Sequence, residues 1–222
     1  MIYTQKLSGG LIDTSNLEFA RPDAVSIIYC SVKSAIFVMV SALVMLILAK
    51  IMKSKGFKFK QPLVITLGVI YSILLVIFGH GVGLYAIKGM FLFAVLMYAS
   101  CSDLTNHEVD DCVWVIIIAL AFVDLGSIAS MLFGAAAVFV PMFIVAFVSK
   151  KSLGGADIKI ITALAFLLGF ERSIAAMFIG LLSSVVVMSI YRKRHKESRS
   201  EPFALVPFLS AGALFLYIMC IS

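Results

Sequence analysis

The amino-acid sequence predicts an all-α, polytopic membrane protein: a helix bundle with about eight transmembrane helices. Of its 222 residues, 62% are hydrophobic and 14% are charged, whereas soluble domains are about 45–50% apolar and about 25% charged. About 20 consecutive apolar residues are enough to cross a bilayer, and such runs fill most of residues 24–221. Helices are expected because hydrocarbon offers no partner for open backbone groups, and the runs lack the alternation of barrel strands.

The apolar runs and the breaks between them set the predicted helices. Residues 113–148 are too long for one crossing at about 1.5 Å per residue, so two helices are expected there. Their turn is placed near residues 124–127, with Gly134 as an alternative. In chain order, the predicted helices cover 24–49, 62 to a turn at 79–81, 84–100, two within 113–148, 158–169, 173–190 and 203–221.

The placement of the basic residues, which give the chain a net charge of +6, predicts its membrane topology. Thirteen of the eighteen basic residues fall into three short stretches, at 50–60, 150–159 and 192–199. Short basic loops stay on the cytoplasmic side during insertion, so both termini are predicted to be extracytoplasmic. Residues 1–23 are expected to form an extracytoplasmic tail and 24–222 a single transmembrane domain in contact with the lipid bilayer. No nucleic-acid partner is expected from charge placed in this way.

No metal or cofactor is expected. The four cysteines form no CxxC pair, and small apolar residues packed in helices explain them better than a zinc site does. They are Cys30, Cys101, Cys112 and Cys220. No cleavable signal peptide is expected either, because residues 1–23 lack a basic start followed by an apolar core.

Two aspartates lie at helix ends on the same predicted face. Asp103 closes the third predicted helix and Asp157 opens the sixth. An ionisable group at membrane depth is costly and marks a functional site by default, although an aspartate at a helix end can also be an ordinary interface group. Two carboxylates brought close share one proton. One member can then take a proton from water while the other donates to a carbonyl, which is aspartyl peptide hydrolysis.

The sequence around these aspartates resembles a known family. Residues 102–111, SDLTNHEVDD, and 152–159, SLGGADIK, resemble the two signature motifs of the type IV prepilin peptidases and archaeal preflagellin peptidases. These are GxGD-type aspartyl membrane proteases. In the second motif Ala156 replaces the glycine directly before the aspartate. Glycines at 154 and 155 allow close backbone approach and left-handed conformations. The Pro-Phe segments at 202–203 and 207–208 also look like the entry to the family's last helix.

The resemblance implies a function. It makes Asp103 and Asp157 the catalytic pair of an aspartic endopeptidase in the cytoplasmic (inner) membrane, with its active site facing the cytoplasm. The substrates would be prepilin-like or preflagellin-like precursors, cut between a short basic leader and an apolar helix. Residues 50–61 hold no cysteine, unlike the zinc-binding loop of the large bacterial members. N-methyl transfer is therefore not assigned.

Other polar residues are assigned supporting roles. Gly154, Gly155 and Lys159 accompany Asp157, with Lys159 expected to pair with that aspartate or to reach lipid headgroups. Glu108, together with the two aspartates that follow it at 110 and 111, either attracts the basic leader or forms a solvated loop. His107 is expected to face water.

Two alternative functions remain open at this stage. A presenilin-like intramembrane protease would carry Pro-Ala-Leu before its last helix, where this chain has Pro-Phe-Leu at 207–209. A small transporter or assembly scaffold would use the carboxylates to bind cations, and such proteins often show internal symmetry, which is not evident here.

Overall fold

The computed structural model describes residues 24–57, 59–79, 81–124, 126–148, 154–195 and 204–219. Within these ranges the chain forms eight α-helices and no strand, which confirms the predicted all-α class. The helices are α1 Ala24–Ser54, α2 Gln61–Phe78, α3 Leu84–Asn106, α4 Cys112–Ala121, α5 Ile128–Val148, α6 Gly155–Leu168, α7 Phe170–His195 and α8 Val206–Met219. The expected tail at 1–23 and most of the expected loops at 149–157 and 191–201 lie outside the described residues.

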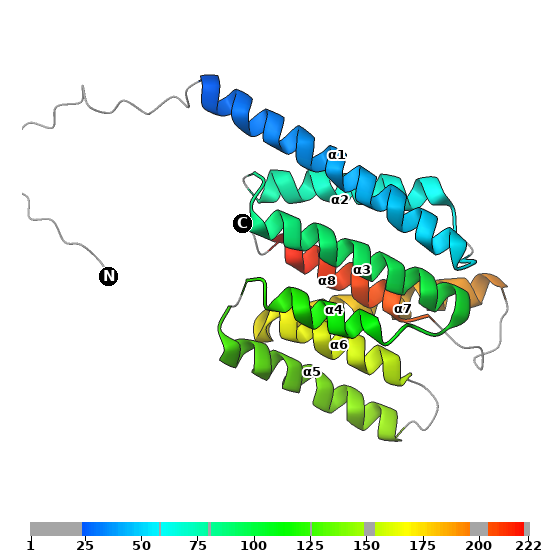
Figure 1. Ribbon diagram of the computed structural model, residues 1–222. Coiled ribbons are helices and arrows are strands. Elements are labelled where there is room, and N and C mark those ends of the chain that lie inside the picture. The colour runs from blue at the N-terminus through cyan, green and yellow to red at the C-terminus, as the bar shows by residue number, and fades with distance from the viewer. Residues whose placement is uncertain are drawn as a thin grey trace, which may run out of the picture.

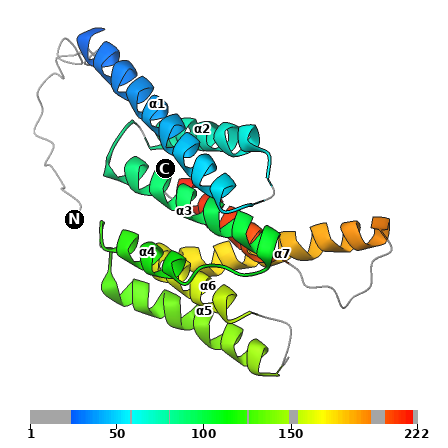
Figure 2. The same ribbon diagram turned by 45° about the vertical axis from the view of Figure 1, so that its right-hand side comes forward.

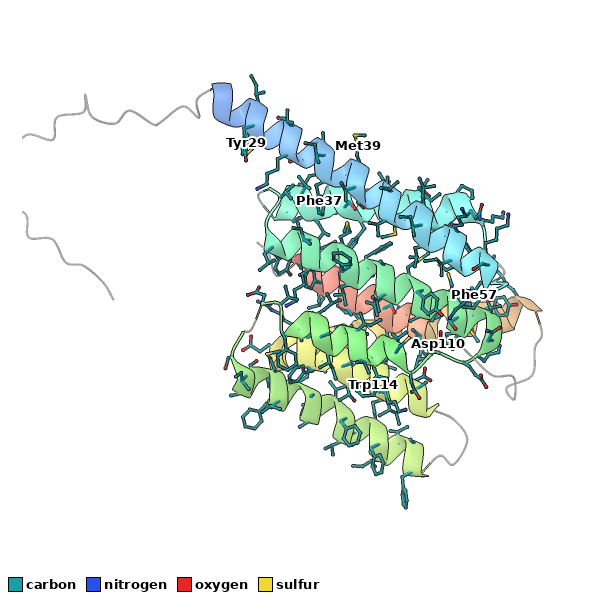
Figure 3. All side chains as sticks on the ribbon, viewed as in Figure 1. Tyr29, Phe37, Met39, Phe57, Asp110 and Trp114 are labelled. Carbon is teal, nitrogen blue, oxygen red and sulfur yellow. The ribbon has the colours of Figure 1, made fainter. Side chains whose placement is uncertain are left out.

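Five of these helices are long and apolar enough to cross a membrane: α1, α2, α3, α5 and α7. Helices α4 and α8 are shorter apolar helices, and α6 has 14 residues. Most large side chains on the outer faces of α1, α5 and α7 are exposed, as expected for surfaces that meet lipid tails. Tyr29 and Met39 on α1 point away from the bundle in Figure 3, whereas Phe37 packs into the core.

The helices are layered around α3 and α8. Helices α1 and α2 lie on one side of this pair and α4, α6 and α5 lie on the other, an order that Figures 1 and 2 both show. Helix α7 packs on α8 and extends past the end of the bundle in Figure 2. Helix α3 is the most buried of the five long helices, because it contacts α1, α2, α4 and α8.

The predicted turns are largely confirmed. Helix α2 begins at Gln61 with Pro62 in its first turn and ends before Gly79. The long apolar run divides between α4 and α5 at residues 122–127. The alternative turn at Gly134 is wrong, because that residue lies inside α5 and packs against Gly169.

Several predicted boundaries are wrong. Helices α1, α3 and α7 end at Ser54, Asn106 and His195 instead of residues 49, 100 and 190, and α6 begins at Gly155 instead of residue 158. The turn predicted at 169–172 is a break of one residue, since Gly169 adopts φ +79° and α7 starts at the next residue. A left-handed conformation costs glycine little, so the chain reverses here without a longer loop. Both candidate aspartates therefore lie inside helices.

Small residues let α7 and α8 approach closely. A Cβ placed on Gly212 would lie 2.5 Å from the backbone carbonyl oxygen of Ala176 and 3.1 Å from the backbone nitrogen of Gly180. Membrane helices gain no hydrophobic driving force from one another, so close backbone packing at such positions holds them together.

Substituting Gly212→Ala is expected to destabilise the bundle by about 1–3 kcal/mol, because the added methyl group collides with backbone atoms. The measurement is the thermal unfolding midpoint of the purified protein in detergent. Gly126→Ala is the control, since a Cβ at that position meets no atom within 4 Å. Equal midpoints for the two variants would contradict the packing described here.

Candidate active site

Asp103 lies in the last turn of α3 and is 6% exposed. Its Oδ2 accepts a hydrogen bond of 3.0 Å from the backbone nitrogen of Val206, the first residue of α8. The first amide groups of a helix have no partner within that helix and carry partial positive charge. The Asp103 carboxylate satisfies one of them and fixes the end of α3 to the start of α8. The sequence showed a helix start near this point, but not this bond.

Asp157 lies in the first turn of α6 and is partly buried. A Cβ on Gly154 would lie 3.4 Å from the Asp157 Oδ2, so this glycine leaves the carboxylate room. Gly154 has φ −73° and ψ 143°, and Gly155 is helical. The left-handed conformation considered for these glycines is therefore not used. Ala156 fits the motif position because that position is ordinary helix.

The two carboxylates act on each other electrostatically. Helix α8 contacts both α3 and α6. Asp157 lies outside the five long apolar helices. Burial and, to a smaller extent, the nearby charge of Asp103 together raise the pKa of its carboxyl group to about 6. Two acids coupled in this way titrate as a pair that retains one proton over part of the pH range.

The α3–α4 loop, residues 107–111, is held by lysines from two other segments. Lys55, after α1, donates hydrogen bonds to Oδ2 of Asp110 at 2.9 Å and to the Tyr98 hydroxyl at 2.6 Å. The Tyr98 hydroxyl also donates to Asp110, and these two neighbours lower the pKa of the Asp110 carboxyl. Figure 3 shows Asp110 at the same end of the bundle as Phe57.

Lys159 completes this arrangement from α6. Its Nζ lies 2.7 Å from Oδ1 of Asp111 and lowers the pKa of that carboxyl. Lys159 was expected to pair with Asp157 or to reach lipid headgroups; the first expectation is wrong, because its described partner is Asp111. In both lysine–aspartate pairs the lysine side chain is half exposed. Exposed ion pairs contribute little net stability, so these two mainly position the loop.

Glu108 and His107 are exposed, as expected for His107. His107 ends α3 in a left-handed conformation, with φ 53°, and its backbone nitrogen donates to the carbonyl of Asp103. Ser102 donates to the carbonyl of Glu108 at 2.8 Å, which anchors the start of the loop. Glu108 is the one acidic residue of this loop without a salt bridge in the described part of the chain.

The described residues contain no group of three or more histidine, cysteine, aspartate or glutamate side chains that could hold a metal ion. The expected absence of a cofactor stays a prediction.

Fold and site together define a multi-pass membrane protein that brings two carboxyl groups to one end of a helix bundle. Residues 90–190 match the model of the type IV leader peptidase family, and this segment includes both Asp103 and Asp157. The resemblance predicted from the motifs is confirmed: this segment is similar to the type IV leader peptidase family.

Two curated relatives are similar over part of their length. The chain is 36% identical over 70 residues to a prepilin leader peptidase/N-methyltransferase of Pectobacterium carotovorum subsp. carotovorum, covering 32% of this chain and 25% of that protein. It is 28% identical over 87 residues to a prepilin leader peptidase/N-methyltransferase of Bacillus subtilis (strain 168), covering 39% of this chain and 35% of that protein. The matches thus span about a quarter to a third of these relatives. No solved structure matches.

Proposed function

We propose that this protein is an aspartic endopeptidase of the membrane, with Asp103 and Asp157 as its catalytic pair. The observation that carries the proposal is the placement of these two carboxyl groups: they are 54 residues apart in sequence, yet the last turn of α3 and the first turn of α6 bring them near enough for one charge to affect the other. The match of residues 90–190 to the type IV leader peptidase family supports the same reaction. A cation-binding transporter would require ligands beyond a proton-sharing pair, and no observation favours one.

The surroundings of each carboxyl group suggest its role. The Val206 amide donates to Asp103, an interaction that favours a charged carboxylate, and burial together with the charge of Asp103 raises the pKa of Asp157 to about 6, which favours its protonated form. Asp103 accepts a proton from water while the water oxygen attacks the carbonyl carbon of the scissile peptide. Asp157 donates its proton to the carbonyl oxygen. Collapse of the tetrahedral species breaks the C–N bond, and the amine leaves with a proton returned from the pair.

The catalytic end of the bundle is assigned to the cytoplasm. Described basic residues near the ends of α1 and α7 and the start of α2 gather there, as the positive-inside rule predicts. They are Lys50, Lys53, Lys55, Lys60, Lys193 and Arg194. In this topology residues 24–222 form one peptidase domain in the inner membrane, and both termini are extracytoplasmic.

The proposed substrates are prepilin-like or preflagellin-like precursors with a basic leader ahead of an apolar helix. The names of the curated relatives support a prepilin substrate. The apolar helix of such a precursor fits a membrane-embedded enzyme, and the leader meets the acidic α3–α4 loop. We assign Gly154 and Gly155 to backbone clearance beside Asp157, Lys159 to positioning Asp111, and Glu108 to contact with the leader.

Replacing either Asp103→Asn or Asp157→Asn is expected to lower cleavage of a co-expressed precursor by roughly 10²–10⁴-fold, because one member of the acid–base pair is lost. Cleavage is followed by the shift of the precursor on a gel, with membrane expression checked by immunoblot. Asp124→Asn, on the α4–α5 turn, is the control and should keep activity. Cleavage at the normal rate by either variant would remove that aspartate from the pair.

The pH dependence of cleavage follows from the pKa of Asp157. The rate should fall as the pH rises through about 6 and beyond, because Asp157 loses the proton that it donates. It should also fall at lower pH, where the pair binds a second proton and no base remains. The check is kcat/KM of the reconstituted enzyme over about two pH units on each side of that value. A flat profile would exclude the shared-proton mechanism.

Glu108→Gln is expected to raise KM for a precursor with a basic leader by roughly two- to fivefold, the size of an exposed ion pair, with kcat little changed. Added salt should raise the KM of the wild type for this precursor and change the KM of the variant less, since salt screens exposed charges. Glu171→Gln, at the start of α7, is the matched control. An unchanged KM in Glu108→Gln would leave this glutamate as a solvated loop residue.

A further inference from the structure

A cavity of about 690 Å³ lies at the end of the bundle opposite to the candidate active site. It is formed by the first turns of α3 and α5, the α4–α5 turn, the break between α6 and α7, and the end of α8. Its lining includes Lys88, fifteen residues before Asp103 on α3, which places the two about 22 Å apart along the helix. The cavity therefore does not belong to the carboxylate pair. Its volume is within the range of small-molecule binding sites.

Lys88 is the unusual residue of this cavity. Only 6% of its surface is exposed, although it lies within a helix apolar enough to cross a membrane. Its described hydrogen bond is a donation of 3.3 Å to the backbone carbonyl of Asp124. No described carboxylate lies within salt-bridge distance of its Nζ. A buried ammonium group needs an anionic or several neutral acceptors, and one long bond to a carbonyl is not enough.

The rest of the lining is partly apolar. Met131, Phe133 and Leu167 form an apolar part of the wall. Tyr85 and Tyr217 form another part, with stacked rings 4.2 Å apart at their centroids and reciprocal hydroxyl–carbonyl hydrogen bonds. An apolar wall beside a buried cation suits a ligand with an anionic head and a hydrocarbon chain.

Lysines in membrane helices can avoid burial by extending towards the surface, as the exposed Lys33 on α1 is able to do. Lys88 does not, since its side chain lines the cavity. The other charged residues of the lining, Asp124, Glu171 and Arg172, are exposed at the mouth. Lys88 is thus the buried charge within it.

We propose that this cavity binds an anionic amphiphile, with its phosphate or carboxylate head on the Nζ of Lys88 and its hydrocarbon chain against the apolar wall. A phospholipid and a fatty acid both have this chemistry. Under the proposed topology the site opens at the extracytoplasmic side of the membrane, where lipid is the abundant source. The site itself does not depend on the proposed peptidase function.

The test uses the full chain purified in a neutral detergent. Phosphatidylglycerol, oleate, phosphatidylcholine and inorganic phosphate are added separately, and binding is measured by native mass spectrometry and by the shift in thermal unfolding midpoint. Phosphatidylglycerol or oleate should bind, and comparison of the two identifies the head group that is preferred. Phosphatidylcholine and inorganic phosphate should bind at least about tenfold more weakly, since one has no net charge and the other no chain.

Lys88→Met should weaken the preferred amphiphile about tenfold or more, because a charge-assisted hydrogen bond is lost, while Lys88→Arg keeps binding. Lys33→Met is the matched control and should bind as the wild type does. Ser127→Trp places a bulky side chain in the lining of the cavity and leaves Lys88 unchanged. This variant should also lose binding, and it tests the proposal if Lys88→Met does not fold. Equal binding by Lys88→Met or Ser127→Trp, or equal binding of phosphatidylcholine, would overturn the proposal. Precursor cleavage, measured alongside, reports separately on the peptidase function.

Discussion

The hydrogen bond from the Val206 amide to the Asp103 carboxylate determines the geometry of the candidate site. It joins the last turn of α3 to the first residue of α8, and α8 in turn packs against α6, which carries Asp157. The positive end of α8 offers a partner to a carboxylate that would be costly to bury without one. One bond thus gives Asp103 a structural role and a fixed position beside the second acid.

The sequence predicted the helices well because the bilayer restricts the alternatives. Runs of apolar residues in hydrocarbon must satisfy their backbone groups internally, so helices and the polar breaks between them follow from composition. The errors fall where polar residues continue a helix. Residues 101–106 look like a loop, yet α3 includes them, because Ser102 and Asp103 find partners in the Glu108 carbonyl and the Val206 amide. Glu108 and Val206 both lie beyond the end of α3, so the hydropathy of the helix does not reveal these hydrogen bonds.

The sequence identified the candidate site only through its two motifs. Asp103 and Asp157 were selected by their positions and by resemblance, whereas the lysines that hold the α3–α4 loop were not. Lys55 reaches Asp110 across 55 residues, and Lys159 reaches Asp111 across 48. Long, flexible side chains on a basic surface have many possible partners, so sequence spacing does not select one. The role of Lys88 was missed for a related reason. A lysine near a helix end is expected to reach water, and only the packing of the segments around the cavity shows that this one is enclosed.

The lysine–aspartate pairs also bear on how a basic leader would be bound. Lys55 and Lys159 are each half exposed, so their ion pairs form in contact with water and contribute little net stability. A lysine of an incoming leader would therefore replace either one at small cost, and the displaced lysine would regain its hydration. Under the proposed function, such exchange would select for basic leaders without a strongly charged empty surface, which would attract other cations. It also implies modest affinity from charge alone. Tight binding would then come from the apolar helix of the substrate against the bundle, and the acidic loop would set the position of the scissile bond relative to Asp103 and Asp157.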